Sequence, residues 1–145
     1  MDKKSQVNIK NRKSSYEYEI LDTYIAGIQL YGSEVKSIRD GRVSLTDSYC
    51  YINNGEVFVK NMSIQNMDHM EPHDPERLKK LLLNRSEIDR LERDLDQGLT
   101  IIVRSIFTIR GIIKLEIALA KGKKLYDRRE TIKKRDAERE IKKIK

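Results

Sequence analysis

The stretch LTIIVRSIFTIRGIIKLEIALA, residues 99–120, decides the fold of this chain. Its first half, Leu99–Ile109, is rich in β-branched residues and predicts a central strand. Gly111 turns the chain back, because glycine accepts the positive φ values of a tight turn. In the second half alternate residues are apolar and share one strand face, at Ile113, Leu115, Ile117 and Leu119. The stretch therefore predicts an antiparallel hairpin.

Two regions that precede this hairpin also have the pattern of strands. The segment 16–31 begins with a period of two and is interrupted at Gly27, which indicates one long bent strand or two short ones. Further along, Tyr49–Ile52 and Val57–Val59 flank Asn53-Asn54-Gly55, and this arrangement is a strong hairpin signal. Together these regions predict five or six short antiparallel strands.

Three segments between the strands predict helices. Ser33 is a candidate N-cap of a short helix that stops at Gly41. Asp74-Pro75 predicts the start of a second helix, with apolar residues at helical spacing, at Leu78, Leu81 and Leu82. Asn84 and Glu87 resemble a capping box that opens a third helix, which buries Ile88, Leu91 and Leu95. The predicted fold is mainly β with flanking α-helices, an OB-like small antiparallel β-barrel.

The net charge of +7 is unevenly distributed. Residues 1–15 hold five basic residues and one acidic residue, residues 16–120 hold 13 basic and 17 acidic, and residues 121–145 hold 12 basic and five acidic. We therefore predict a flexible basic N-terminal arm (1–15), an RNA-binding barrel (16–120) and a disordered basic C-terminal tail (121–145). Basic arms bind polyphosphates because each neutralised phosphate releases a counterion. The alternative reading is that the arms only keep the protein soluble.

Few features of the sequence indicate catalysis. His69 and His73 lie in a polar loop with Asp68 and Asp74, but Pro72 separates the histidines, and a plain loop is the favoured interpretation over a metal site. The single cysteine, Cys50, has no CxxC partner and is expected in the core of a protein from a reducing compartment. There is no apolar run of membrane-spanning length and no leader-like start. We expect a cytoplasmic protein that is not an enzyme, binds no metal or cofactor and contacts no membrane.

Short segments spread along the chain carry a family resemblance. They are Asn11-Arg12-Lys13, Ala26–Leu30, Gly32–Arg39, Asp47–Tyr49, Lys80–Leu83, Ala118–Lys124 and Tyr126–Glu130. In this order and spacing they resemble the small protein B family, which binds transfer-messenger RNA and rescues stalled ribosomes in bacteria. The resemblance extends from Asn11 to the C-terminus, nearly the whole chain.

The resemblance implies a mechanism without covalent chemistry. The barrel is expected to cradle the tRNA-like domain of transfer-messenger RNA at its elbow and to deliver this RNA to stalled ribosomes for trans-translation. The tail is expected to become helical on the ribosome, where it occupies the empty mRNA path and the decoding centre. The implied partners are transfer-messenger RNA, the stalled 70S ribosome and, through the RNA, elongation factor Tu.

The resemblance also assigns site residues. Those of the body are Asn11, Arg12, Lys13, Glu34, Lys36 and Arg39, and those of the tail are Lys121, Gly122, Lys123, Lys124, Asp127, Arg128 and Arg129. The sequence itself adds Tyr16 as a base-stacking candidate, because it adjoins the basic N-terminal segment. A carboxylate such as Glu34 accepts hydrogen bonds from base amino and imino groups, although it also complements the dipole of its own helix.

This chain departs from the family pattern at three places, and two other functions remain open. Arg128 stands where lysine is usual, Val103-Arg104 where Val-Pro is common, and Gln65–Met67 replaces a segment that often ends in Pro-Tyr. A ribosome-assembly or initiation-type OB protein would use the same basic arms without one preferred RNA. An enzyme acting on RNA would depend on a metal at His69 or His73.

Overall fold

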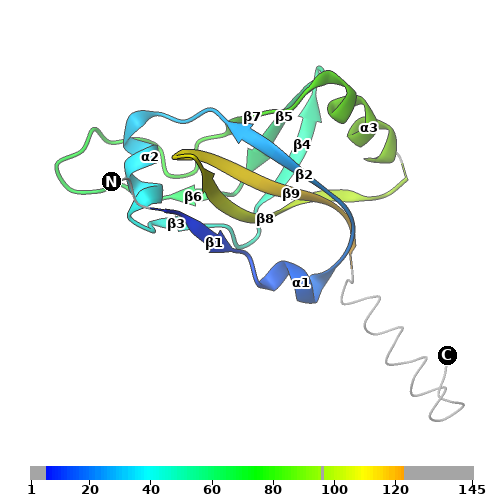
Figure 1. Ribbon diagram of the computed structural model, residues 1–145, viewed down its shortest axis with the longest axis horizontal. Coiled ribbons are helices and arrows are strands. Elements are labelled where there is room, and N and C mark those ends of the chain that lie inside the picture. Colours follow the sequence, from blue (N-terminus) through cyan, green and yellow to red (C-terminus); the bar gives the residue numbers. More distant parts are fainter. Residues whose placement is uncertain (1–5, 96, 123–145) are drawn as a thin grey trace, which may run out of the picture.

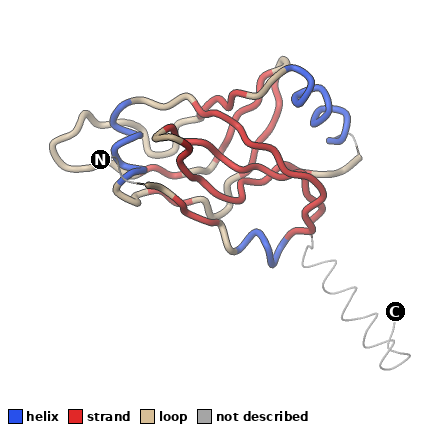
Figure 2. The backbone as a smooth tube through the Cα atoms, in the orientation of Figure 1, coloured by secondary structure: helices blue, strands red, loops and turns tan. Residues whose placement is uncertain are grey.

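The computed structural model describes residues 6–95 and 97–122. Figure 1 shows strands at the centre of the molecule and helices on the outside. Figure 2 shows the same backbone coloured by secondary structure. In chain order the elements are β1 (Asn8–Lys10), α1 (Lys13–Glu17), β2 (Tyr18–Ile28), α2 (Gly32–Arg39), β3 (Val43–Ser44), β4 (Tyr49–Asn53), β5 (Glu56–Lys60), β6 (Ser63–Ile64), β7 (Lys79–Leu82), α3 (Arg85–Leu95), β8 (Thr100–Ile109) and β9 (Ile112–Gly122).

The main sheet closes on itself. Its strand order is β1-β8-β4-β5-β7-β2-β9, and β9 returns to pair with β8. Every pairing within it is antiparallel, as is the separate pair β3–β6. The predicted mainly β class with flanking helices is confirmed, and the ring of pairings is the closed arrangement that a small barrel requires.

The predicted central hairpin is confirmed as β8 and β9. Ile109 pairs with Ile112 across a two-residue turn, in which Arg110 and Gly111 have φ values of 52° and 78°. Positive φ at both turn residues matches the twist of the flanking strands. The four alternating apolar residues of β9 are buried inside the closed sheet, at Ile113, Leu115, Ile117 and Leu119.

The second predicted hairpin is confirmed as β4 and β5. Its turn residues, Asn54 and Gly55, also have positive φ, 53° and 77°. Cys50 on β4 is a buried free thiol, and burial raises its pKa above the ordinary value. The prediction that Cys50 belongs to the core is therefore confirmed.

The helix predicted from Asp74-Pro75 onward is wrong, because Lys79–Leu82 form strand β7, which pairs with β5 and β2. Lys79 and Leu81 are buried, whereas Leu82 is 47% exposed. A lysine at an inward position and a leucine at an outward one hide the alternation of this strand. The carboxylate of Asp74 makes a tight local turn instead, since its Oδ1 accepts a hydrogen bond of 3.0 Å from the Glu76 N–H.

Helix α2 begins two residues earlier than predicted. Tyr31, not Ser33, is its N-cap residue, with extended backbone at φ −78° and ψ 159°. The Tyr31 N–H donates a 2.8 Å hydrogen bond to Oε1 of Glu34, which is the carboxylate half of a capping box. Ser33 has a residue type that is common at N-caps, but its hydroxyl lies 3.0 Å from Nδ1 of His73.

The capping box predicted for α3 is confirmed. The Glu87 N–H donates to Oδ1 of Asn84 at 3.0 Å, and the Asn84 N–H donates to Oε1 of Glu87 at 3.1 Å. The apolar face of α3 packs against the core, with Ile88 and Leu91 buried and Leu95 half-buried.

Strand pairing extends to both sides of residues 16–120. Val7 is only 5% exposed and β1 pairs with β8, so Asn8–Lys10 form part of the sheet within the segment that the sequence predicts as a flexible arm. At the other end β9 continues to Gly122, where Lys121 and Gly122 pair with Glu19 and Tyr18 of β2. Residues 1–5, 96 and 123–145 lie outside the described residues.

Candidate nucleic-acid interface

The predicted site residues of the body fall into two separate groups. One group lies at and just before α1, and comprises Asn11, Arg12, Lys13 and Tyr16. The other lies on α2, and comprises Glu34, Lys36 and Arg39. Figure 1 shows α1 and α2 at different ends of the closed sheet, with α1 beside the junction where β2 begins and β9 ends. The two groups therefore form two surfaces, which we name the α1 surface and the α2 surface.

Asn11 has a structural role on the α1 surface. Its side-chain Nδ2 donates to the Leu45 carbonyl at 3.1 Å and to the Val103 carbonyl at 3.0 Å. Because an amide nitrogen carries two hydrogens, both donors are used within the protein. Asn11 thus joins the end of β1 to the chain before β4 and to β8, and only its Oδ1 remains for a ligand.

Lys13 and Tyr16 are the accessible members of the α1 surface. The Lys13 ammonium lies 3.3 Å from Asp47 and 3.7 Å from Glu17, and its hydrogen bond and charge interaction with Asp47 raise its pKa. These partners are exposed, so the ion pairs are weak and a phosphate could replace them. Tyr16 is 73% exposed, which leaves its ring free to stack. Arg12 is also exposed.

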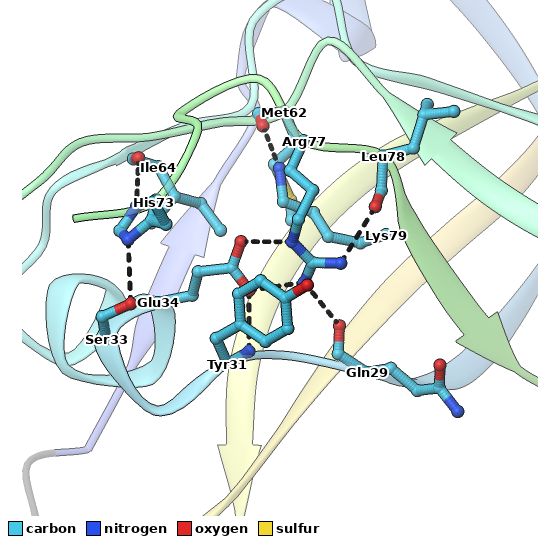
Figure 3. Close-up of polar contacts among 10 residues, drawn as sticks. All are labelled: Gln29, Tyr31, Ser33, Glu34, Met62, Ile64, His73, Arg77, Leu78 and Lys79. Atoms are coloured by element: carbon cyan, nitrogen blue, oxygen red, sulfur yellow. Dashed lines mark hydrogen bonds and ion pairs between the residues drawn. The ribbon is translucent and has the colours of Figure 1, made fainter. Parts of the chain in front are cut away.

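Glu34, predicted as a base contact, is fully buried in the structure (Figure 3). Besides the Tyr31 N–H, its Oε1 accepts from Nη2 of Arg77 at 2.6 Å, and its Oε2 accepts from Nε of Arg77 at 2.9 Å. Burial alone would raise the Glu34 pKa, but the hydrogen bonds from Arg77 and Tyr31 outweigh it and the pKa is lowered. This carboxylate therefore positions Arg77 instead of facing a base.

The half-buried Arg77 and the exposed Tyr31 form a pair that sequence reasoning missed. The guanidinium carbon of Arg77 lies 4.0 Å from the centroid of the Tyr31 ring. Both side chains are drawn in the close-up of Figure 3. Arg77 precedes β7 and Tyr31 precedes α2, and 43 residues separate Arg77 from Glu34. No local sequence pattern connects positions so far apart. The predicted helix also placed Arg77 within a helical segment, whereas it lies in the loop before β7.

The other two members of the α2 surface carry positive charge. Lys36 is exposed on the helix. Arg39 donates from Nη2 to the Gly111 carbonyl at 2.7 Å, and so ties α2 to the β8–β9 turn, where Arg110 is exposed. The α2 surface therefore presents an exposed lysine on the helix and the exposed aromatic ring of Tyr31 at its N-cap.

A buried lysine, Lys79, and a half-buried histidine, His73, hold the loop that carries Arg77. Lys79 donates from Nζ to the Met62 carbonyl at 2.7 Å, and desolvation lowers its pKa. Nδ1 of His73 lies 3.0 Å from the Ser33 hydroxyl, and Nε2 donates to the Ile64 carbonyl at 2.8 Å. The bonds to Met62 and Ile64 lie within the segment 62–79, and the contact with Ser33 connects that segment to the first turn of α2. They also use both ring nitrogens of His73, while His69 is exposed, and no cluster of three or more metal-ligating side chains occurs within residues 6–95 and 97–122.

The predicted tail residues are divided by the edge of the described chain. Lys121 and Gly122 belong to β9, with Lys121 exposed, whereas Lys123, Lys124, Asp127, Arg128 and Arg129 lie outside the described residues. None of the helices in the described segments has the length and apolarity to cross a membrane.

Comparisons with known proteins give a consistent result. A family model described as SmpB protein matches residues 8–145. An SsrA-binding protein of Christiangramia forsetii is 48% identical over 145 residues, covering 97% of this chain and 92% of the relative. An SsrA-binding protein of Thermosipho africanus is 50% identical over 135 residues, covering 90% and 91%. A solved structure described as "tmRNA-SmpB: a journey to the center of the bacterial ribosome" is similar with a TM-score of 0.71 and 39% identity, over 88% of this chain and 92% of the other.

Proposed function

This chain belongs to the SmpB protein family, and from that premise we propose that it binds the tRNA-like domain of transfer-messenger RNA and delivers this RNA to stalled ribosomes for trans-translation. The observation that carries the proposal is the match to SsrA-binding proteins along nearly the full length of both chains. The similar structure, which concerns SmpB with transfer-messenger RNA and the ribosome, supports the same assignment. The protein then acts in the cytoplasm, by binding and not by catalysis.

The body contacts the RNA through residues of two kinds. Lys36 and Arg39 on the α2 surface, and Arg12, Lys13 and Tyr16 on the α1 surface, contact the RNA directly with charge or an aromatic face. Asn11 and Glu34 act indirectly, since their hydrogen bonds are made within the protein. Residues 16–120 hold 13 basic and 17 acidic residues, so the local clusters of cations direct the RNA to these two surfaces.

The tail serves the ribosome. We assign this role to Lys121, Gly122, Lys123, Lys124, Asp127, Arg128 and Arg129, with the tail becoming helical in the empty mRNA path and in the decoding centre. Elongation factor Tu joins the complex through the RNA. The pairing of Gly122 with Tyr18 supports this division, because it fixes the start of the tail beside the α1 surface.

A truncation after Gly122 tests the proposal. This end point keeps the β2–β9 ladder complete, whereas removal from Lys121 onward would delete two paired residues. The truncated protein should bind a transcript of the tRNA-like domain with nearly full affinity, but should not support peptide tagging on an mRNA that lacks a stop codon. Complete loss of RNA affinity in a truncated protein that still unfolds cooperatively would contradict the division of roles.

Competition separates this function from that of a general OB-type RNA binder. Unlabelled transfer-messenger RNA should displace the labelled transcript at far lower concentration than bulk tRNA or ribosomal RNA. Equal displacement by all three would favour a ribosome-assembly or initiation role.

A further inference from the structure

Tyr31 is an exposed aromatic residue held in one orientation. It is 57% exposed, although its backbone is fixed at the start of α2. Its N–H donates to Oε1 of Glu34 at 2.8 Å, and its carbonyl accepts from the Val35 N–H at 3.0 Å. One ring face lies against the Arg77 guanidinium, and the residue as a whole remains more than half exposed. An ordered aromatic face costs little conformational entropy when a ligand binds.

Arg77 is arranged to support the ring and not to bind phosphate. Its guanidinium donates to both oxygens of Glu34, to the Gln29 carbonyl at 3.3 Å and to the Leu78 carbonyl at 3.2 Å. An arginine has five N–H donors, so these contacts use four of them. The buried carboxylate also compensates its charge. A bidentate phosphate contact would need two free donors in the plane of the fork, and Arg77 lacks them.

We propose that Tyr31, backed by Arg77, is the stacking platform for one unpaired nucleobase of the RNA. The proposal rests on the function proposed above and specifies how the α2 surface contacts its partner. A base is the occupant that fits, since every base has a π-face that stacks on an aromatic ring, and Lys36 lies exposed on the same helix to pair with the adjoining phosphate. The guanidinium on the far side keeps the ring from turning away.

The affinity test compares two substitutions at the same position. Tyr31→Leu removes the ring and should weaken binding of the tRNA-like transcript by about five- to 100-fold, the range of a lost base–aromatic stack. Tyr31→Phe keeps the ring and should recover most of that loss. Equal weakening by both variants would assign the effect to the hydroxyl and overturn the proposal, as would wild-type affinity in Tyr31→Leu. Thermal unfolding of each variant shows whether a loss of affinity reflects loss of the fold.

A spectroscopic test detects the stack directly. The chain contains no tryptophan, so Tyr31→Trp places a single fluorophore at the platform. When the transcript is added, stacking of a base should quench the fluorescence of this tryptophan. Tyr51→Trp is the control that should not respond, because residue 51 lies on the β4–β5 hairpin, where the Tyr51 ring stacks on Phe58. Binding without quenching at position 31 would refute the platform while leaving the proposed function intact. Absence of binding by the wild-type protein would refute the proposed function itself. A response to ribosomes free of transfer-messenger RNA, with none to the transcript, would assign the ring to a different partner.

Discussion

Replacement of Glu34 by glutamine tests whether this buried carboxylate organises the α2 surface. The change keeps the shape of the side chain but leaves the Arg77 charge without its partner, at a side chain that is only 25% exposed. Removal of one member of a buried pair costs about 3–5 kcal/mol, and the partial exposure of Arg77 reduces this, so we expect a loss of about 2–4 kcal/mol in the free energy of unfolding. Urea denaturation at neutral pH measures it.

The pH dependence gives this prediction a second readout. The folded-state pKa of Glu34 is below its ordinary value, so the ionised carboxylate contributes stability above the unfolded-state pKa, and that contribution is lost as the pH falls through the folded-state pKa. The difference in stability between wild type and Glu34→Gln should therefore be constant near neutrality and shrink in acid. Glu56→Gln is the matched control, because Glu56 bonds to Lys80 at 2.8 Å while half-exposed, and its loss should cost less than about 1 kcal/mol. The reasoning would be refuted if both variants lost the same free energy of unfolding. It would also be refuted if the difference between wild type and Glu34→Gln did not change with pH.

Two further substitutions separate structural residues from RNA contacts. Asn11→Ala removes two hydrogen bonds to buried carbonyl acceptors and should lower the free energy of unfolding by about 1–3 kcal/mol, while the folded protein keeps most of its RNA affinity; unchanged stability in urea would contradict the structural role. Lys36→Gln should weaken RNA binding and reduce the slope of log K against log salt by about one, since one phosphate contact is lost, and a slope equal to that of wild type would show that Lys36 contacts no phosphate.

Sequence reasoning succeeded where the determining signal is local. Both hairpins were predicted because a two-residue turn and a period of two lie within about 20 residues of sequence, and the cap of α3 because Asn84 and Glu87 are three residues apart. It failed at β7, where Lys79 is an inward residue whose ammonium reaches the Met62 carbonyl. In the sequence, a lysine that is buried against a backbone carbonyl cannot be distinguished from a lysine that faces solvent, because the carbonyl comes from a distant part of the chain.

The site residues selected by the family resemblance stay predictions, and the structure adds contacts that the sequence does not reveal. Glu34 lies on α2, but its partner Arg77 comes from a loop 43 residues away. Asn11 likewise reaches the Val103 carbonyl, 92 residues along the chain. Such contacts form because the closed sheet brings distant parts of the chain together. They cannot be predicted from the periodicity or spacing of residues within one segment.

The arrangement around Glu34 explains how an acidic residue fits within the surface that we propose for RNA binding. If Arg77 stood alone, its free donors would bind any phosphate, and every RNA would be attracted equally. Because the buried Glu34 carboxylate compensates the charge of Arg77 and accepts its hydrogen bonds, Arg77 has little left for phosphate. Its guanidinium carbon lies 4.0 Å from the centroid of the Tyr31 ring instead. Charge-driven affinity is then left to Lys36 and the other exposed cations, while the ring selects for an RNA that offers an unpaired base at that point. An exchange of Glu34 for glutamine should accordingly raise affinity for duplex RNA and so reduce discrimination between the tRNA-like transcript and duplex RNA, a pattern that a simple loss of folded protein cannot produce.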